Sequence, residues 1–244
     1  MPARTYQDLL KNPYDEQLFD YYFTSQLVRI KEGIVYEIGK PAIYGSTLSL
    51  FPRINPLLLI ATVHRPYSYQ VPVYNFPQKF EVIDLQGNSI YTLADNPTIN
   101  IPMGYDTTSP YPRQFGWRSD QPATVYWAEA QDKGDPKQNK TDFMDIIYQI
   151  SYPFNSEKQE VAKTEKRFRN ILWNDDAFAL LIETSRETRK KQDIYLLSLA
   201  LLSLRFYYSM YPPTIITTIR EIHLRLKMRM VNISFISIKP TMSY

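Results

Sequence analysis

Acidic residues gather at one point of the sequence, where they could bind a calcium ion. Glu129, Asp132 and Asp135 lie close together along the chain, and carboxylate oxygens are the ligands that calcium prefers. Their spacing lacks the regular positions and the closing glutamate of a calcium-binding hand. Gly134 and Pro136, which lie among them, favour a tight turn instead. A cation cluster and a turn are therefore the two alternatives, and the sequence favours the turn.

Two further groups of polar residues could line a site, but each has a simpler explanation. Asp142 and Asp145 are expected on the solvent-facing side of a strand. Residues 64–69 (HRPYSY) combine basic and aromatic side chains and could line a pocket. A single histidine at the end of a strand is more commonly structural, and the sequence shows no partner for His64.

Nucleophilic and metal chemistry lack their usual residues. The chain has no Cys and only two histidines, His64 and His223, which excludes thiol nucleophiles, Cys-ligated metals and a multi-histidine metal site. A serine hydrolase of the α/β type carries its nucleophile in a Gly-x-Ser-x-Gly turn. Gly45-Ser46 is the nearest match and lacks the flanking glycines, and no glycine-rich phosphate-binding loop occurs. We therefore predict no catalytic, cofactor-binding or metal-binding residue in this chain, and no cofactor.

Composition indicates a globular protein rich in strands. The 244 residues suit one domain or slightly more, and values of 44% hydrophobic and 22% charged residues exclude wholesale disorder. Twenty Tyr and twelve Phe favour strands, because aromatic side chains pack well on a pleated surface.

The hydrophobic period changes early in the chain. Residues 5–30 repeat apolar side chains near helical spacing, interrupted by Pro13, and predict a helical lead-in segment. Residues 84–88 (DLQGN) predict a hairpin turn with Gly87 at positive φ. No run of helical period separates the later apolar runs, so an all-β fold built of hairpins is expected. The clearest predicted strands are 57–64, 80–84, 89–93, 123–130, 143–150 and 177–184.

Three of these strands repeat as a unit. Residues 57–62, 123–130 and 177–184 are similar apolar strands, and the last two each follow a turn that begins with Trp and contains Asp, at 117–120 and 173–176. Repeats with a Trp/Asp turn and several short strands are typical of propeller blades. A partial β-propeller of about three blades is therefore predicted, with a β-sandwich as the alternative.

The last residues differ from the rest in charge and glycine content. Residues 191–244 contain seven Lys or Arg and two acids, a net charge of +5, whereas the other residues sum to −2 and hold all seven glycines. The net positive charge of the chain comes from this tail alone, so we expect no nucleic-acid partner. The longest apolar run, residues 194–204, is about half of what a bilayer requires, and we expect neither a membrane span nor a signal peptide.

Residues 113–136 (RQFGWRSDQPATVYWAEAQDKGDP) closely resemble a signature of the prolyl oligopeptidase family, in its glutamyl endopeptidase-like branch. Further similar segments are YQDLLKNPYDE (6–16), RPYSYQVP (65–72), NFP (75–77) and IP (101–102). The resemblance implies a serine peptidase in which an N-terminal β-propeller screens peptides and a C-terminal α/β-hydrolase domain carries the Ser-Asp-His triad. Intact bacterial members are expected in the periplasm or outside the cell, and the location of this chain stays open.

The resemblance covers residues 5–190, which match only the middle of that propeller. No position matches the triad motifs, so no catalytic residue is carried over. We therefore expect a helical lead-in (1–32), a partial propeller (33–190) and a basic tail (191–244). The predicted function is that of a fragment of a propeller-gated peptidase, inactive alone, whose intact relatives take peptides as partners. The alternative is a free-standing propeller-like module that binds peptides or proteins.

The tail itself is predicted to be translated out of frame. If each triplet is taken as the last base of one codon and the first two of the next, residues 206–222, continued by His223, allow the sequence LLFDVSTNDNYNDPGNP. This sequence resembles the family's next segment. Near the break, residues 191–195 (KQDIY) can become Thr-Arg-Tyr-Leu. Loss of one adenine from an A-rich Arg-Lys-Lys tract would produce this shift. The alternative is a genuine basic strand region.

Overall fold

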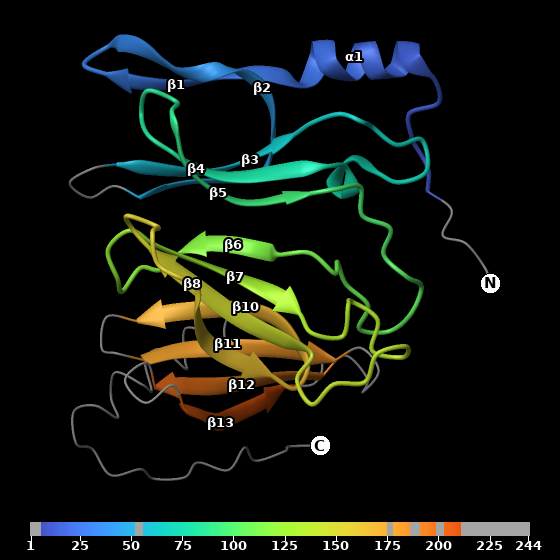
Figure 1. Cartoon of the computed structure of the whole chain (residues 1–244), viewed down its shortest axis with the longest axis vertical. Helices are drawn as coiled ribbons and strands as arrows, with labels where there is room; N and C mark the ends of the chain where they lie inside the picture. The colour runs from blue at the N-terminus through green and yellow to red at the C-terminus, as the bar shows by residue number, and fades with distance from the viewer. Residues whose placement is uncertain (1–5, 52–55, 175–177, 186–190, 199–202, 211–244) are drawn as a thin grey trace, which may run out of the picture.

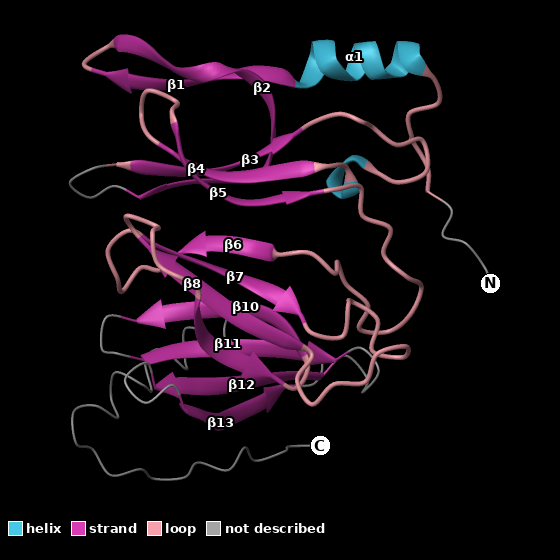
Figure 2. Ribbon diagram, viewed as in Figure 1, coloured by secondary structure: helices cyan, strands magenta, loops and turns pink. Residues whose placement is uncertain are grey.

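The computed structural model describes residues 6–51, 56–174, 178–185, 191–198 and 203–210 (Figure 1). Strands dominate these residues, and the helices are α1 and the short 3-10 helix η1 (Figure 2). The elements are α1 (Pro13–Phe23), β1 (Thr24–Lys31), β2 (Ile34–Phe51), β3 (Leu57–Val63), η1 (Val73–Asn75), β4 (Gln78–Ile83), β5 (Ser89–Asn96), β6 (Arg113–Trp117), β7 (Thr124–Ala130), β8 (Asp145–Ser151), β9 (Gln159–Thr164), β10 (Arg167–Asn174), β11 (Phe178–Ser185), β12 (Lys191–Ser198) and β13 (Ser203–Met210).

The strands form three antiparallel sheets that follow one another in chain order. The first sheet contains β1 to β5, the second β6 to β9 and the third β10 to β13, and within each sheet every strand pairs with its neighbour in sequence. The sheets are stacked along the long axis of the molecule (Figure 1). Up-and-down sheets packed in succession are the arrangement of propeller blades. The all-β class and the partial β-propeller of about three blades are confirmed.

The predicted strands and the predicted turn occur where expected. The six apolar runs correspond to β3, β4, β5, β7, β8 and β11. Between β4 and β5, Asp84 Oδ1 accepts hydrogen bonds from the backbone N–H groups of Gln86 at 2.9 Å and Asn88 at 2.8 Å. Gly87 has a φ of +85°, as its place in this turn requires.

The internal repeat corresponds to equivalent strands. β3, β7 and β11 are each bordered on both sides by strands of their own sheet. All three are rich in buried residues, and these lie on both faces of each strand. Their continuous apolar sequence, without alternation, follows from this double burial.

The lead-in segment is only partly helical, and the prediction of one helical piece over residues 5–30 is wrong. α1 begins at Pro13, and the side chain of Asn12 caps it by accepting hydrogen bonds from two backbone N–H groups. The helix ends at Phe23, and the next eight residues form β1. Val28 and Ile30 lie in β1, where β-branched side chains are favoured. Pairing with β2 therefore decides the structure of this segment.

β2 changes partner along its length. Residues 34–43 pair with β1, and residues 43–51 pair with β3. Ile38 of the first part packs in a buried cluster with Leu58 and Ile60 of β3. The hairpin of β1 and β2 forms a separate layer beside the rest of the first sheet (Figure 1). It thus covers the face of the first sheet that points away from the second sheet.

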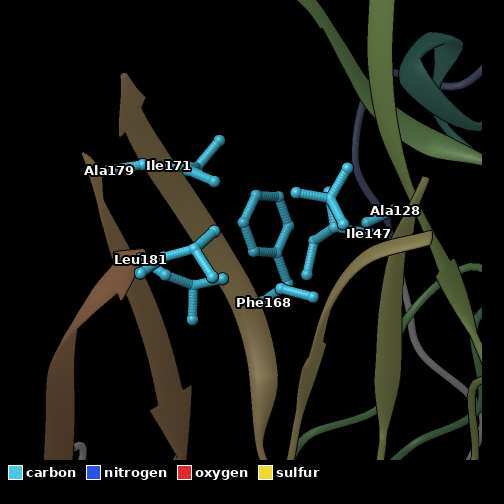
Figure 3. Close-up of a cluster of buried hydrophobic side chains, with 9 residues drawn as sticks. Ala128, Ile147, Phe168, Ile171, Ala179 and Leu181 are labelled. Carbon is cyan, nitrogen blue, oxygen red and sulfur yellow. The ribbon is translucent and has the colours of Figure 1, made fainter. Parts of the chain in front are cut away.

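Two buried clusters hold the sheets together. Leu59 of the first sheet packs with Val125 and Trp127 of the second. In the other cluster, Phe168 of β10 lies between Ile147 of the second sheet and Leu181 of the third (Figure 3). Each buried side chain of this size contributes about 1.5–3 kcal/mol.

The Trp/Asp turn of the second sheet also joins neighbouring sheets. Trp117 Nε1 donates a hydrogen bond to the carbonyl oxygen of Ser49 in β2, at 3.2 Å. The guanidinium of Arg118 lies 4.1 Å from the ring centroid of Trp173 in β10 and is ion-paired with Asp120. Cation–π contact and a paired charge allow this buried arginine to sit between two sheets.

The third sheet continues past the boundary expected at residue 190. β12 and β13 pair with one another, and Ile194 and Leu197 of β12 are buried. Residues 211–244, most of the predicted tail, lie outside the described residues. Among the helices that the structure describes, none has the length and hydropathy needed to cross a membrane.

Candidate functional site

A polar cavity of about 360 Å3 lies where the first strands of the second and third sheets begin. We call it the arginine cavity, because Arg113 of β6 and Arg167 and Arg169 of β10 line it. The opposite wall is the loop that joins the first sheet to the second, including Asp106 and Thr108.

Asp145 is the centre of an ion network behind this cavity. Its Oδ2 accepts from Arg113 Nη2 at 2.6 Å and from the backbone N–H of Phe168 at 2.7 Å, and its Oδ1 lies 3.1 Å from Arg167 Nη1. Arg167 is also ion-paired with Asp132. Asp132, Asp145 and Arg167 are buried. Such charges are tolerated in an interior because each is paired and hydrogen-bonded.

The prediction that Asp145 faces solvent is therefore wrong. Asp142 is exposed as expected, but it precedes β8 and does not lie in the strand. Asp145 shares a face of β8 with Ile147, and that face packs against the third sheet. The sequence pattern suggested a half-exposed strand, but both faces of β8 are covered by neighbouring sheets.

The acidic segment forms a tight turn, as the sequence favoured. Asp132 Oδ1 accepts from the backbone N–H of Gly134 at 3.0 Å, and the N–H of Asp135 donates to the Asp132 carbonyl at 3.1 Å. Glu129 points elsewhere and binds Lys158 at 2.7 Å. Within the described ranges, no three His, Cys, Asp or Glu side chains are grouped so that they could hold a metal ion.

This turn supports the loop that forms the cavity wall. The N–H of Thr108 donates to the Gly134 carbonyl at 3.0 Å, and a Cβ at position 134 would lie 2.3 Å from the Thr108 oxygen. Arg167 Nε donates to the carbonyl of Asp106, and Ser185 Oγ donates to the Asp106 carboxylate at 3.0 Å. The wall is therefore fixed by contacts from the second and third sheets.

Sequence reasoning missed the arginines of the cavity. Arg113 and Arg167 are the first residues of β6 and β10, and Trp117 and Trp173 lie at or near the ends of the same strands. An arginine several residues before each tryptophan of the repeat was the available signal. It was not recognisable, because the first strands of the blades were not predicted.

The segment 64–69 has a structural role next to α1. Arg65 is ion-paired with Glu16 and Asp20, one helical turn apart, and Tyr69 donates to Glu16 at 2.8 Å. His64 Nε2 lies 2.8 Å from Asp95 Oδ1, so it has the partner that the sequence did not reveal. The segment thus attaches the helix to the first sheet.

These contacts change the acidity of both helix carboxyl groups. The hydroxyl of Tyr69, followed by Arg65, holds the pKa of Glu16 below its ordinary value of 4.5. Desolvation by itself would raise the pKa of Asp20, but hydrogen bonds from Tyr67 and Arg65 outweigh it and the pKa is lowered. Both groups are therefore ionised in the folded state at neutral pH.

No serine is activated by a histidine in the part of the chain that the structure describes. His64 binds Asp95 and the carbonyl oxygen of Arg65. Ser46, the nearest sequence match to a nucleophile, is exposed in β2, and Ser185 donates to Asp106. His223 lies outside the described residues. The arginine cavity, by contrast, presents charged and polar residues that could bind a polar group.

The sequence is similar to two plant proteins. Proteins named "Probable glutamyl endopeptidase, chloroplastic" from Oryza sativa subsp. japonica and Arabidopsis thaliana are each 42% identical to it, over 192 and 193 residues respectively. The chain is related to proteins named as peptidases. Each alignment covers 77% of this chain but 20% of the plant protein, so the chain spans about a fifth of the length of these relatives.

No protein-family model matches the sequence. Among solved structures, "Oligogalacturonate lyase in complex with manganese" is similar with a TM-score of 0.49 and 12% sequence identity, over 76% of this chain and 48% of that protein.

Proposed function

We propose that this chain is a segment of the substrate-screening propeller of a serine peptidase of the prolyl oligopeptidase type. It contributes no catalytic group and is inactive alone. The observation that carries the proposal is the 42% identity to proteins named glutamyl endopeptidase, over a region that makes up 20% of their length. Three successive antiparallel sheets support it, because a propeller contains such sheets as blades.

Inactivity follows from the chemistry that peptide hydrolysis requires. A serine peptidase needs a nucleophilic hydroxyl, a base that takes its proton and a third group that orients the base. Across the described residues, His64 has Asp95 as an orienting partner but no serine in hydrogen-bond contact. The proposed role is therefore binding or screening of peptides, with the hydrolytic groups supplied by another part of a longer protein.

A fluorophosphonate probe tests this proposal directly, because it reacts covalently with activated serines. We expect no labelling of the purified chain and no cleavage of fluorogenic peptides that contain glutamyl residues, the class that the names of the relatives indicate. A serine hydrolase treated in parallel shows that the probe is active. Labelling of this chain, or cleavage that persists after repeated purification, would refute the proposal.

One observation favours the alternative of a free-standing binding module. The hairpin of β1 and β2 covers the first sheet where a preceding blade would lie, through Ile38 and Leu27. A monomer that melts cooperatively would support this alternative. Aggregation through uncovered strand edges is the outcome expected for an isolated segment of a ring.

A further inference from the structure

Arg169 carries an unpaired positive charge at the arginine cavity. Its side chain is exposed in β10, and none of the described residues forms an ion pair or hydrogen bond with its guanidinium. Its backbone is held in place, because Gln114 Nε2 donates to the Arg169 carbonyl at 2.9 Å. A charged group on a fixed strand, next to a cavity, is suited to binding a ligand.

The cavity also contains hydrogen-bonding groups that are not used. Thr108 and Thr184 line it, and neither hydroxyl donates to another described residue. Arg113 Nη1 is buried and has no acceptor in the described part of the chain. A buried donor without an acceptor costs free energy, and an oxygen-bearing ligand that reached it would relieve this cost.

The charged groups at the cavity limit which anion fits. Arg113 and Arg167 are ion-paired with Asp132 and Asp145. The carboxylate residue Asp106 lines the same cavity as Arg169. The Asp106 carboxylate already accepts from Ser185. A phosphate dianion would place excess negative charge beside Asp106, whereas a single carboxylate requires only one guanidinium.

We propose that the arginine cavity binds one carboxylate group of a peptide, with Arg169 as the charged partner. The planar guanidinium offers two parallel N–H groups to the two carboxylate oxygens, and the threonine hydroxyls donate from the wall. This inference rests on the proposed function for its ligand class, peptides. It adds the residue that selects acidic peptides and the position at which they bind.

Calorimetric titration of the purified full chain tests the site with three pentapeptides of otherwise identical sequence. One has a central Glu and both ends blocked, the second has a central Gln and both ends blocked, and the third has a central Gln and a free C-terminal carboxylate. We expect at least one carboxylate peptide to bind about tenfold more tightly than the blocked Gln peptide. The Glu and free-terminus peptides distinguish a side-chain carboxylate from a terminal one.

The Arg169→Gln variant is expected to lose this preference while its melting temperature stays unchanged, since the side chain is exposed and has no partner among the described residues. Arg29→Gln is the matched control, because Arg29 is an exposed strand arginine on the hairpin of β1 and β2. Equal affinity for all three peptides, or a preference that Arg169→Gln retains, would overturn the inference. Labelling by the fluorophosphonate probe would overturn the proposed function instead and would leave this binding preference standing.

Discussion

Arg167 Nη1 lies 3.1 Å from Asp145 Oδ1, and this ion pair joins the first strand of the third sheet to the third strand of the second. The same aspartate binds Arg113 of the second sheet. Successive sheets of a propeller are otherwise held mainly by apolar contacts, which do not fix direction. The buried ion network therefore fixes how the two sheets are placed and, through them, the walls of the arginine cavity.

Replacement of Asp145 by Asn is expected to destabilise the fold strongly. The substitution removes the charged partner of Arg113 and leaves Arg167 with Asp132 alone. Breaking a buried ion pair in this way costs about 3–5 kcal/mol. Urea denaturation measures the change. Asp142→Asn is the control, because this nearby side chain is exposed and its loss should alter stability by less than about 0.5 kcal/mol. Similar stability of the two variants would show that the network does not support the fold.

Gly87→Ala is expected to be more damaging than Gly33→Ala. Both glycines have positive φ, +85° and +79°, but a Cβ at position 87 would lie 2.2 Å from the Gly39 Cα, whereas none of the neighbouring atoms lies within 4 Å at position 33. Alanine at position 33 should cost about 1 kcal/mol of backbone strain. The clash should add about 1–3 kcal/mol at position 87.

Thermal melting of the two variants measures this difference. The comparison isolates the close approach of the β4–β5 turn to β2, since the backbone strain is common to both. Equal melting temperatures would mean that the hairpin of β1 and β2 does not lie against the first sheet as described.

Acid should release α1 from the first sheet. The pKa values of Glu16 and Asp20 are lowered in the fold, from ordinary values of 4.5 and 3.8. A carboxyl group with a lowered pKa stabilises the fold above its unfolded pKa, and this contribution disappears as the pH falls through the folded value. The attachment should therefore be complete at neutral pH and weaken progressively below about pH 4.5.

Hydrogen exchange of the α1 amides, corrected for intrinsic rates, measures this release. Arg65→Met removes the cation that both carboxylates bind. The variant should show weaker protection of α1 at pH 7 and a smaller loss of protection on acidification. Unchanged protection in the variant would argue against the role assigned to segment 64–69.

The gene sequence tests the predicted change of reading frame. Across codons 186–195 we expect an A-rich tract that lacks one adenine, followed by a shifted frame that encodes the LLFDVSTNDNYNDPGNP segment. Comparison with genes of close relatives provides the measurement. An uninterrupted frame in such relatives that encodes the same tail would contradict the prediction.

Local patterns in the sequence predicted the strands that carry the repeat. β3, β7 and β11 have buried residues on both faces, so their apolar runs are continuous and easily recognised. The turn at Asp84–Gly87 was also predictable, because its residue types satisfy the turn by themselves. β1, β6 and β10 were missed because they are short or mixed in polarity, and their pairing with distant strands decides their structure.

Local residue order is enough to predict the all-β class, the repeated strand and the acidic turn, and it carries the similarity to proteins named as peptidases. The three-dimensional fold was needed to show that Asp145 is buried, that the segment after α1 is a strand and that three arginines line one cavity. These features depend on contacts between segments that are far apart in the sequence. The residue that pairs with a charge, or that buries one face of a strand, therefore cannot be read from the neighbouring residues.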